Sequence, residues 1–187
     1  MKLESLIDFE WYNEPDNVVF ADQEMKIVAK PQTDFWQAVH HKLSKDNAHF
    51  FYKTVADDFE LIVKWRCQQS TDFNQCGLMV RSDERHWFKM SLMSKDERSP
   101  EIGTCLTLQG HSDWAGTALS SLPTEIFYKI TRKQDDFVAF YSLDGRHYTR
   151  LRQFYMPHID PEIKAGAYIA APQNKPFEAV LDEIDFF

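Results

Sequence analysis

Two neighbouring stretches of the sequence carry polar and ring-bearing side chains at a spacing that suits the binding of a sugar-like ligand. Gln75 and Arg81 alternate with apolar residues in 74–81, and Trp87 and Lys89 do the same in 85–93. A period of two is typical of a β-strand whose apolar set faces a core, so the other set shares the opposite face. An indole can lie on the C–H face of a sugar while long polar side chains donate hydrogen bonds to its hydroxyls. We therefore expect Gln75, Arg81, Trp87 and Lys89 to form a ligand-binding surface.

Further residues of the same chemical kinds extend this expected surface. Trp36 and Trp114 each lie beside polar residues and are expected to stack on the ligand or to wall its site. Asp113 is expected to hydrogen-bond the ligand, and Thr107 falls on the outward face of an alternating stretch nearby. Two other interpretations stay open, because polar side chains on a sheet often only face solvent and exposed tryptophan also marks protein interfaces.

Residues for hydrolysis, nucleophilic attack or metal binding do not stand out. Glycoside hydrolysis needs two carboxylates flanking the scissile bond, and the acidic pairs of this chain, such as Asp83-Glu84 and Asp135-Asp136, lie in expected turns. The sequence has no Gly-x-Ser-x-Gly motif and no His-x-x-x-His spacing. It therefore predicts no catalytic residue, metal ligand or cofactor, and it favours a non-catalytic protein.

Composition restricts the partners further. The 187 residues carry a net charge of −8 and no basic cluster, which argues against nucleic acid and against an anionic membrane surface. No apolar run approaches the ~20 residues of a membrane span, and the acidic residues within 1–8 do not suit a signal peptide. Cys67, Cys76 and Cys105 are an odd number without close spacing, so buried free thiols are expected. The chain is predicted to be cytoplasmic.

The elements that must position these side chains are strands. Asp58–Gln68 gives the cleanest alternation, and Asp144-Gly145 predicts a tight reversal because glycine accepts a positive φ. No stretch of a dozen residues keeps an apolar face at the helical period, so residues 1–187 are expected to form one all-β domain, an antiparallel sandwich or barrel. The other expected strands are 18–20, 25–29, 48–55, 74–81, 85–93, 102–108, 125–132, 137–143, 148–153, 165–171 and 177–187.

Short landmarks follow one another along nearly the whole chain. They are Trp11-Tyr12-Asn13-Glu14-Pro15, Asp34-Phe35-Trp36, Asp58-Phe59-Glu60-Leu61, 75–81, Trp87-Phe88-Lys89, Ser112-Asp113-Trp114, 141–145 and 181–186. In this order they resemble the landmarks of the DUF1349 family with its regulation-of-enolase relatives, within the concanavalin A-like lectin/glucanase superfamily. The resemblance implies a jelly-roll sandwich of two antiparallel sheets, one of them concave and often the sugar-binding side. The family has no settled activity, and fold alone does not fix function.

The resemblance also bears on the chemistry. Glucanases of the superfamily carry their carboxylates on one strand as Glu-x-Asp-x-x-Glu, an arrangement that no expected strand of this chain has. After Trp-x-Lys the family pattern often ends in an acidic residue, whereas this chain reads Met90-Ser91-Leu92-Met93, with methionine at the acidic position. Residues 142–148 resemble an Asp-box turn, in which the aspartate has a structural role.

Three hypotheses follow, in order of preference. The first is a non-catalytic module that binds a carbohydrate or sugar-like metabolite on its concave sheet. The second is an interaction or regulatory module that docks a protein, such as a glycolytic enzyme, as the family's fungal name suggests. The third is an unrecognised carbohydrate-active enzyme, ranked last because the carboxylate pair is missing.

Overall fold

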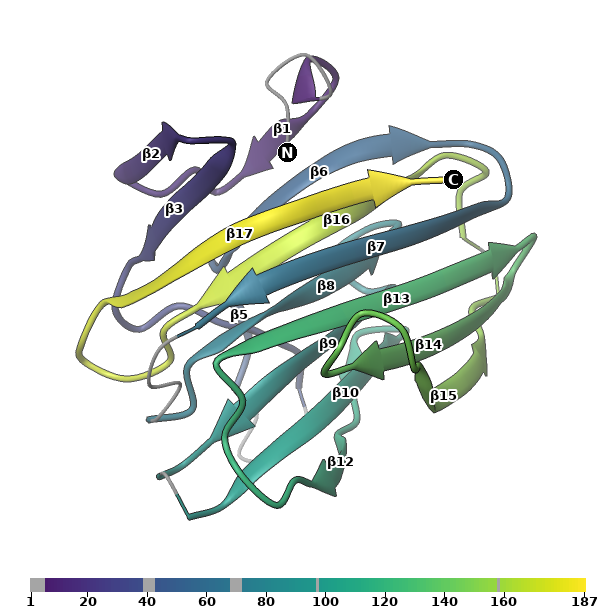
Figure 1. Ribbon diagram of the computed structural model, residues 1–187. Coiled ribbons are helices and arrows are strands. Elements are labelled where there is room, and N and C mark those ends of the chain that lie inside the picture. The colour runs from purple at the N-terminus through teal and green to yellow at the C-terminus, as the bar shows by residue number, and fades with distance from the viewer. Residues whose placement is uncertain (1–5, 39–42, 68–71, 97, 158) are drawn as a thin grey trace.

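Alternating apolar residues fold into two antiparallel β-sheets packed face to face (Figure 1). The structure is a computed structural model that describes residues 6–38, 43–67, 72–96, 98–157 and 159–187. Within these ranges there is no α-helix, and accordingly none that is long and apolar enough to cross a membrane. The prediction of an all-β jelly-roll sandwich is confirmed.

The eight-stranded sheet contains the two stretches that first suggested a binding surface. Its order is β1 (Glu10–Tyr12), β6 (His49–Val55), β16 (Ile163–Ala170), β8 (Gln75–Arg81), β9 (Trp87–Ser94), β10 (Pro100–Leu108) and β11 (His111–Ser112), with β12 (Ala115–Ala118) also paired to β10. Gln75 and Lys89 therefore come from adjacent central strands, β8 and β9, as the sequence predicts.

The seven-stranded sheet forms the front layer in Figure 1. Its order is β15 (Thr149–Tyr155), β14 (Asp136–Ser142), β13 (Glu125–Lys133), β7 (Phe59–Arg66), β17 (Phe177–Phe186), β3 (Glu24–Ala29) and β2 (Asn17–Ala21). The predicted reversal at Asp144-Gly145 joins β14 to β15, and Gly145 has a φ of 71°. Asp144 accepts hydrogen bonds from the amides of Arg146 and His147, so its role in this turn is structural.

The main core lies between the two sheets. Phe88 of β9 stacks on Phe154 of β15 with ring centroids 4.3 Å apart. Two polar groups cross the same space: the Trp65 indole N–H donates to the carbonyl of Gly77 at 2.9 Å, and the Tyr128 hydroxyl donates to the carbonyl of Cys76 at 2.9 Å. These bonds satisfy groups that would be costly to bury unpaired, and they join β7 and β13 to β8.

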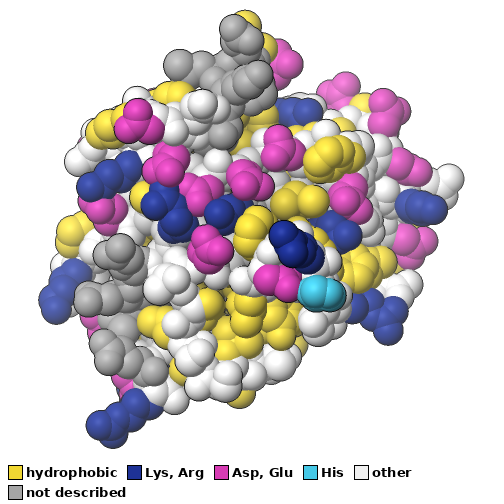
Figure 2. Space-filling model, viewed as in Figure 1, with side chains coloured by type: hydrophobic (Ala, Val, Ile, Leu, Met, Phe, Trp, Pro, Cys, Tyr) yellow, Lys and Arg dark blue, Asp and Glu magenta, His cyan; other side chains and the backbone are white. Residues whose placement is uncertain are grey.

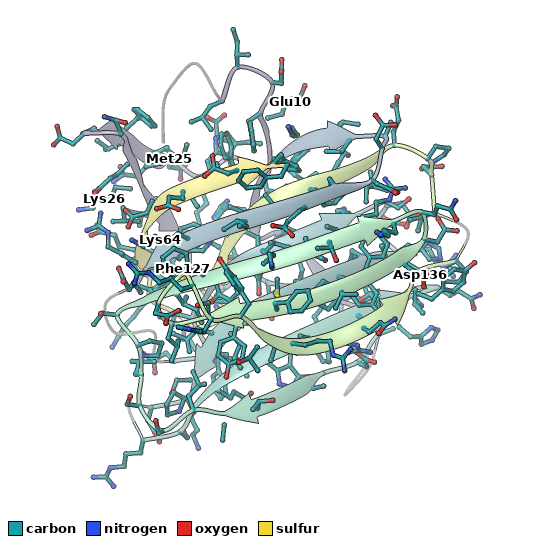
Figure 3. All side chains as sticks on the ribbon, turned by 45° about the vertical axis from the view of Figure 1, so that its right-hand side comes forward. Glu10, Met25, Lys26, Lys64, Phe127 and Asp136 are labelled. Atoms are coloured by element: carbon teal, nitrogen blue, oxygen red, sulfur yellow. The ribbon has the colours of Figure 1, made fainter. Side chains whose placement is uncertain are left out.

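The outer face of the seven-stranded sheet carries charges of both signs (Figure 2). Lys64 contacts Asp182 at 3.3 Å, and its ammonium lies 5.1 Å from the centre of the Phe127 ring. Figure 3 shows Lys64 and Phe127 on this face. These charges therefore pair with each other on the surface of the sheet.

Candidate functional site

A short flap covers part of the outer face of the eight-stranded sheet. We define the flap as residues 33–38 and 43–48. It contains a two-stranded pair, β4 (Phe35–Trp36) and β5 (Lys45–Asp46). Phe35 points into a second hydrophobic cluster, called here the outer cluster, together with Ala48, Phe50, Tyr52, Met79, Trp87, Cys105, Tyr168 and Ala170. The sheet therefore buries apolar side chains on both of its faces, between the sheets and beneath the flap.

The flap corrects the expectation that Trp87 faces solvent. Alternation is confirmed, since Phe88 lies in the core between the sheets and Trp87 on the opposite face. Trp87 is nevertheless 0% exposed, and its ring centroid lies 6.3 Å from that of Phe35. The physical reason is that a period of two assigns a side chain to a face, whereas only the tertiary structure decides what covers that face.

Arg81 is also buried, at 3% exposure, and it anchors the flap. Its guanidinium donates to both carboxylate oxygens of Asp46, at 2.6 and 2.9 Å, and it lies 4.5 Å from the Tyr12 ring centre. A bidentate arginine–carboxylate pair is among the strongest polar contacts available to a protein. We conclude that Arg81 holds β5 onto the sheet, which corrects its assignment to a solvent-facing surface.

Lys89 makes the second buried ion pair with the flap. The Lys89 ammonium, 1% exposed, donates to Asp34 Oδ1 at 2.7 Å and to Gln75 Oε1 at 2.9 Å. The Tyr168 hydroxyl donates to the same Gln75 oxygen at 3.1 Å. Asp34 in turn accepts the Phe35 amide at 2.8 Å and donates its own amide to Asn47. This hydrogen-bonded network fixes Lys89, Asp34 and Gln75 in one geometry.

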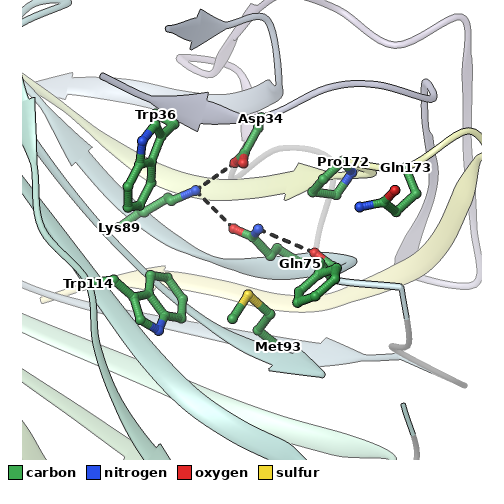
Figure 4. A pocket seen from close by; sticks show the side chains of 9 residues that line it. Asp34, Trp36, Gln75, Lys89, Met93, Trp114, Pro172 and Gln173 are labelled. Carbon is green, nitrogen blue, oxygen red and sulfur yellow. Dashed lines mark hydrogen bonds and ion pairs between the residues drawn. The ribbon is translucent and has the colours of Figure 1, made fainter. Parts of the chain in front are cut away.

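A cavity of about 360 Å³ opens directly beside this network (Figure 4). In Figure 4, Trp36 and Trp114 lie on one side of Lys89 and Gln75, and Pro172 and Gln173 lie on the other. The volume is within the lower range of small-molecule sites, which combine apolar walls with a few fixed polar groups. The lining residues are Asp34, Trp36, Phe73, Gln75, Lys89, Met93, Trp114, Pro172 and Gln173.

Trp114 can lie close to β10 because the residue beneath its ring, Gly103, has no side chain. The Trp114 ring lies against Gly103 of β10, where an added Cβ would be 1.9 Å from the ring carbon Cζ2. The Trp114 indole N–H donates to Glu101 Oε1 at 3.0 Å, which fixes the ring in its plane. Trp36 belongs to β4 and is half-buried at the edge of the outer cluster. Trp36 therefore comes from β4, and Trp114 comes from the short link between β11 and β12.

Phe73 lines the cavity from an unusual backbone conformation. Its φ is 63°, and Asp72 before it has a φ of 57°. Bulky residues rarely adopt the left-handed region, which costs of order 1–3 kcal/mol, and such residues cluster at ligand sites. The Phe73 amide donates to the carbonyl of Ser94 at 2.8 Å, which ties this turn to the end of β9.

The structure brings together half of the predicted site. Trp36, Gln75, Lys89 and Trp114 line the cavity. Arg81, Trp87, Thr107 and Asp113 are not among its lining residues. Thr107 is 0% exposed, with its hydroxyl 2.7 Å from that of Ser112, so the expected solvent-facing surface is corrected here as well.

Asp113 is exposed but engaged elsewhere. Its carboxylate accepts hydrogen bonds from Nη1 and Nη2 of Arg152, at 3.0 and 2.9 Å, and from the Leu106 amide at 3.0 Å. Partial burial alone would raise the pKa of Asp113, but these hydrogen bonds hold it below its ordinary value. Its contacts join β15 to the region of β10, outside the cavity.

Sequence reasoning missed the remaining lining residues, which are Asp34, Phe73, Met93, Pro172 and Gln173. The signal for Asp34 was present, because it stands two residues before Trp36 in one of the landmarks. Met93, where the family pattern often has an acidic residue, also lines the cavity. The carboxylate in the cavity is therefore that of Asp34, which Lys89 neutralises.

Other reactive groups are buried or scattered. Cys67, Cys76 and Cys105 are free and buried, and burial raises the pKa of the Cys105 thiol to about 11. In the described ranges, no group of His, Cys, Asp or Glu side chains is arranged to hold a metal ion. The network around Lys89 places fixed hydrogen-bond donors and acceptors beside the cavity.

Two comparisons of the sequence with known proteins found matches over most of the chain. A model of the family described as "Protein of unknown function (DUF1349)" matches residues 11–186. In Saccharomyces cerevisiae, a protein named Regulation of enolase protein 1 is 25% identical over 173 residues, covering 92% of this chain and 86% of the relative.

Solved structures share the fold. A functionally unknown protein from Saccharomyces cerevisiae has a TM-score of 0.89 at 21% identity, covering 97% of both chains. A GH43 protein from Bacillus licheniformis has a TM-score of 0.74 at 12% identity, covering 96% of this chain but 36% of that one. At these identities the likeness shows a common jelly-roll sandwich.

Proposed function

The chain belongs to the DUF1349 family. We propose that this member of the family is a non-catalytic module that binds a carbohydrate or sugar-like metabolite. We further propose that it is a single domain and acts in the cytoplasm. The ligand occupies the cavity that the flap, β8 and β9 line together with Trp114. Trp36 and Trp114 supply flat apolar faces for the ring, and Gln75, Lys89 and Asp34 supply its hydrogen-bond partners.

The observation that carries this proposal is the combination of two indoles with a buried polar network in one cavity. Sugars present C–H faces that suit aromatic rings and hydroxyls that need fixed donors and acceptors. An ammonium has three N–H donors, and two of those of Lys89 are directed at Asp34 and Gln75. We assign the third to a ligand hydroxyl. Because the network is held in place without the ligand, little ordering is needed on binding.

A thermal-shift screen against neutral monosaccharides, followed by calorimetry, tests the proposal. A ligand at 100 times its Kd should add about 2.7 kcal/mol to the free energy of unfolding. Trp36→Ala and Trp114→Ala should each weaken binding at least tenfold. Tyr155→Ala is the matched control, because Tyr155 is an exposed aromatic residue on the edge of the other sheet. Absence of any stabilising sugar, or equal binding by all variants, would reject the site.

A second candidate function is regulatory docking on a protein. It is favoured by the name of the Saccharomyces cerevisiae relative, Regulation of enolase protein 1. On this alternative, Trp36 and Trp114 contact a protein surface, and enolase is the first partner to test. Specific binding to enolase, lost in the Trp114→Ala variant, together with an empty sugar screen would place this function first.

A further inference from the structure

We propose that the ligand carries a phosphate group, held in a second hollow that adjoins the cavity. This inference rests on the proposed function. The second hollow also has a volume of about 360 Å³, and Phe73 and Gln173 line both spaces. The remaining lining residues of the second hollow are Asp72, Lys95, Asn174 and Lys175. A ring placed between the tryptophans can therefore extend a substituent past Phe73 and Gln173 into the second hollow.

The charges of the two spaces differ. In the first cavity the charged groups are Lys89 and Asp34, which neutralise each other at 2.7 Å. Among the described residues, those that line the second hollow include two cations, Lys95 and Lys175, and one carboxylate, Asp72. This local excess of positive charge occurs in a chain with a net charge of −8. Lysine binds phosphate as a compact point charge, and a solvated pair of lysines can approach a dianion from two sides.

The backbone segments that carry these groups are fixed by hydrogen bonds. On one side, the amides of Asp72 and Phe73 donate to the carbonyls of Lys95 and Ser94, at 3.2 and 2.8 Å. On the other side, the Gln32 amide donates to the Gln173 carbonyl at 2.8 Å. The Gln32 side chain also donates to Asn174 Oδ1 at 3.0 Å. The segments on both sides of the second hollow are thus tied to neighbouring parts of the chain by hydrogen bonds.

The phosphate assignment is more specific than a general preference for sugars. A neutral sugar would occupy the first cavity alone, and the lysines would add nothing to its affinity. A phosphorylated sugar would gain contacts that are electrostatic and exposed to solvent, so its advantage should fall as salt is added. The neutral ring and the charged substituent therefore depend on different residues, which makes them separable by mutation.

The test compares glucose, mannose and galactose with their 6-phosphates by calorimetry, on the wild-type chain and on the Lys95→Ala/Lys175→Ala double variant. We expect a phosphorylated sugar to bind at least tenfold more tightly than its neutral parent in the wild type. The double variant should reduce that ratio to less than threefold and leave the affinity for the neutral sugar unchanged. Lys133→Ala, an exposed lysine on the other sheet, is the matched control.

Several results would overturn the inference. Equal binding of neutral and phosphorylated sugars would do so, as would a ratio that survives in the double variant. If inorganic phosphate bound as tightly as the sugar phosphates, the second hollow would be a general anion site and the sugar ring would add nothing to binding. Glucuronate that binds as tightly as glucose 6-phosphate would assign the hollow to a carboxylate instead. Failure of the proposed function is distinguishable, because then no sugar binds, or Trp36→Ala and Trp114→Ala leave all binding intact.

Discussion

Lys89 occupies a position where lysine is seldom found, because ammonium groups are almost never fully buried unless they are paired. Its 1% exposure is made tolerable by Asp34 and Gln75, which accept two of its hydrogen bonds. The same network supplies the polar floor of the cavity. At the scale of single residues, stability and proposed binding are therefore served by the same side chains, and variants must be chosen to separate the two.

Trp87 and Phe88 offer the clearest residue-level test of the layers. Both are 0% exposed, Phe88 in the core between the sheets and Trp87 beneath the flap. Phe88→Ala and Trp87→Ala should each lower the free energy of unfolding by about 3–5 kcal/mol, because each leaves a cavity among packed side chains. Urea denaturation measures both. A much smaller loss for Trp87→Ala would mean that the flap does not cover it in solution.

His49 should make the protein less stable in mild acid. Burial lowers the pKa of His49 from its ordinary value of 6.5, and the nearby charge of Lys30 lowers it further. The Lys30 amide donates to His49 Nε2 at 3.0 Å, which suits the neutral ring. Below about pH 6.5 the unfolded chain binds a proton that the folded protein does not, so the free energy of unfolding falls until the lowered pKa is reached.

Urea denaturation between pH 7.5 and pH 5 measures this effect, and His49→Gln should flatten the dependence. His147 is the control, because its hydrogen bond to Asp144 raises its pKa and gives the opposite sign. An NMR titration of the His49 ring at or above 6.5 would contradict the prediction.

The flap is the element whose attachment matters most to the site. It supplies Asp34 and Trp36 to the cavity, and it is held by the ion pairs of Arg81 with Asp46 and of Lys89 with Asp34. Arg81→Met should cost about 3–5 kcal/mol of stability, because it leaves the partly buried Asp46 carboxylate without its guanidinium, although the Tyr12 hydroxyl still donates to it. Asp46 retains 25% side-chain exposure, so the lower end of this range is expected.

The double variant Arg81→Met/Asp46→Leu is the informative comparison, again by urea denaturation. It should recover most of the lost stability, because an apolar pair can replace a buried ion pair. If the double variant were as unstable as Arg81→Met alone, an apolar pair could not replace this ion pair, and the prediction would be wrong.

Strand β10 controls the orientation of Trp114 through Gly103. Gly103→Ala should displace the indole, because the new Cβ would lie 1.9 Å from the ring. We expect a shifted tryptophan fluorescence spectrum and a loss of sugar binding comparable to that of Trp114→Ala. Met93→Leu serves as a control of similar volume in the same cavity. Unchanged fluorescence and binding in Gly103→Ala would show that the ring does not rest on β10.

The long strands were predictable and the short ones were not. The stretches with clear alternation, such as residues 59–66 of β7 and 75–81 of β8, occur where the sequence predicts them. The two-residue strands β4 and β5 contain too few residues to show any period. Their position over the outer cluster depends on contacts with distant parts of the chain. This is why the shared face of Lys89 and Gln75 could be predicted from their strands, whereas the burial of Trp87 and Arg81 could not be foreseen.

At the scale of the whole molecule, strand order and chain order disagree in both sheets. β16 lies between β6 and β8, and β17 lies between β7 and β3. Each sheet is thus completed in its interior by a strand from the last part of the chain. Such pairings join residues far apart in sequence, which generally makes folding slow.

This strand order has a consequence for biosynthesis. A ribosome releases the chain from its N-terminal end, so β6, β7 and β8 emerge well before their shared neighbours β16 and β17. Until residues 163–186 are translated, the edges of β6, β7 and β8 that pair with β16 and β17 have no partner strand, and they lie next to apolar side chains. Both sheets therefore close only after residues 163–186 have been synthesised, and ribosome-bound chaperones can act on the half-finished sandwich until then.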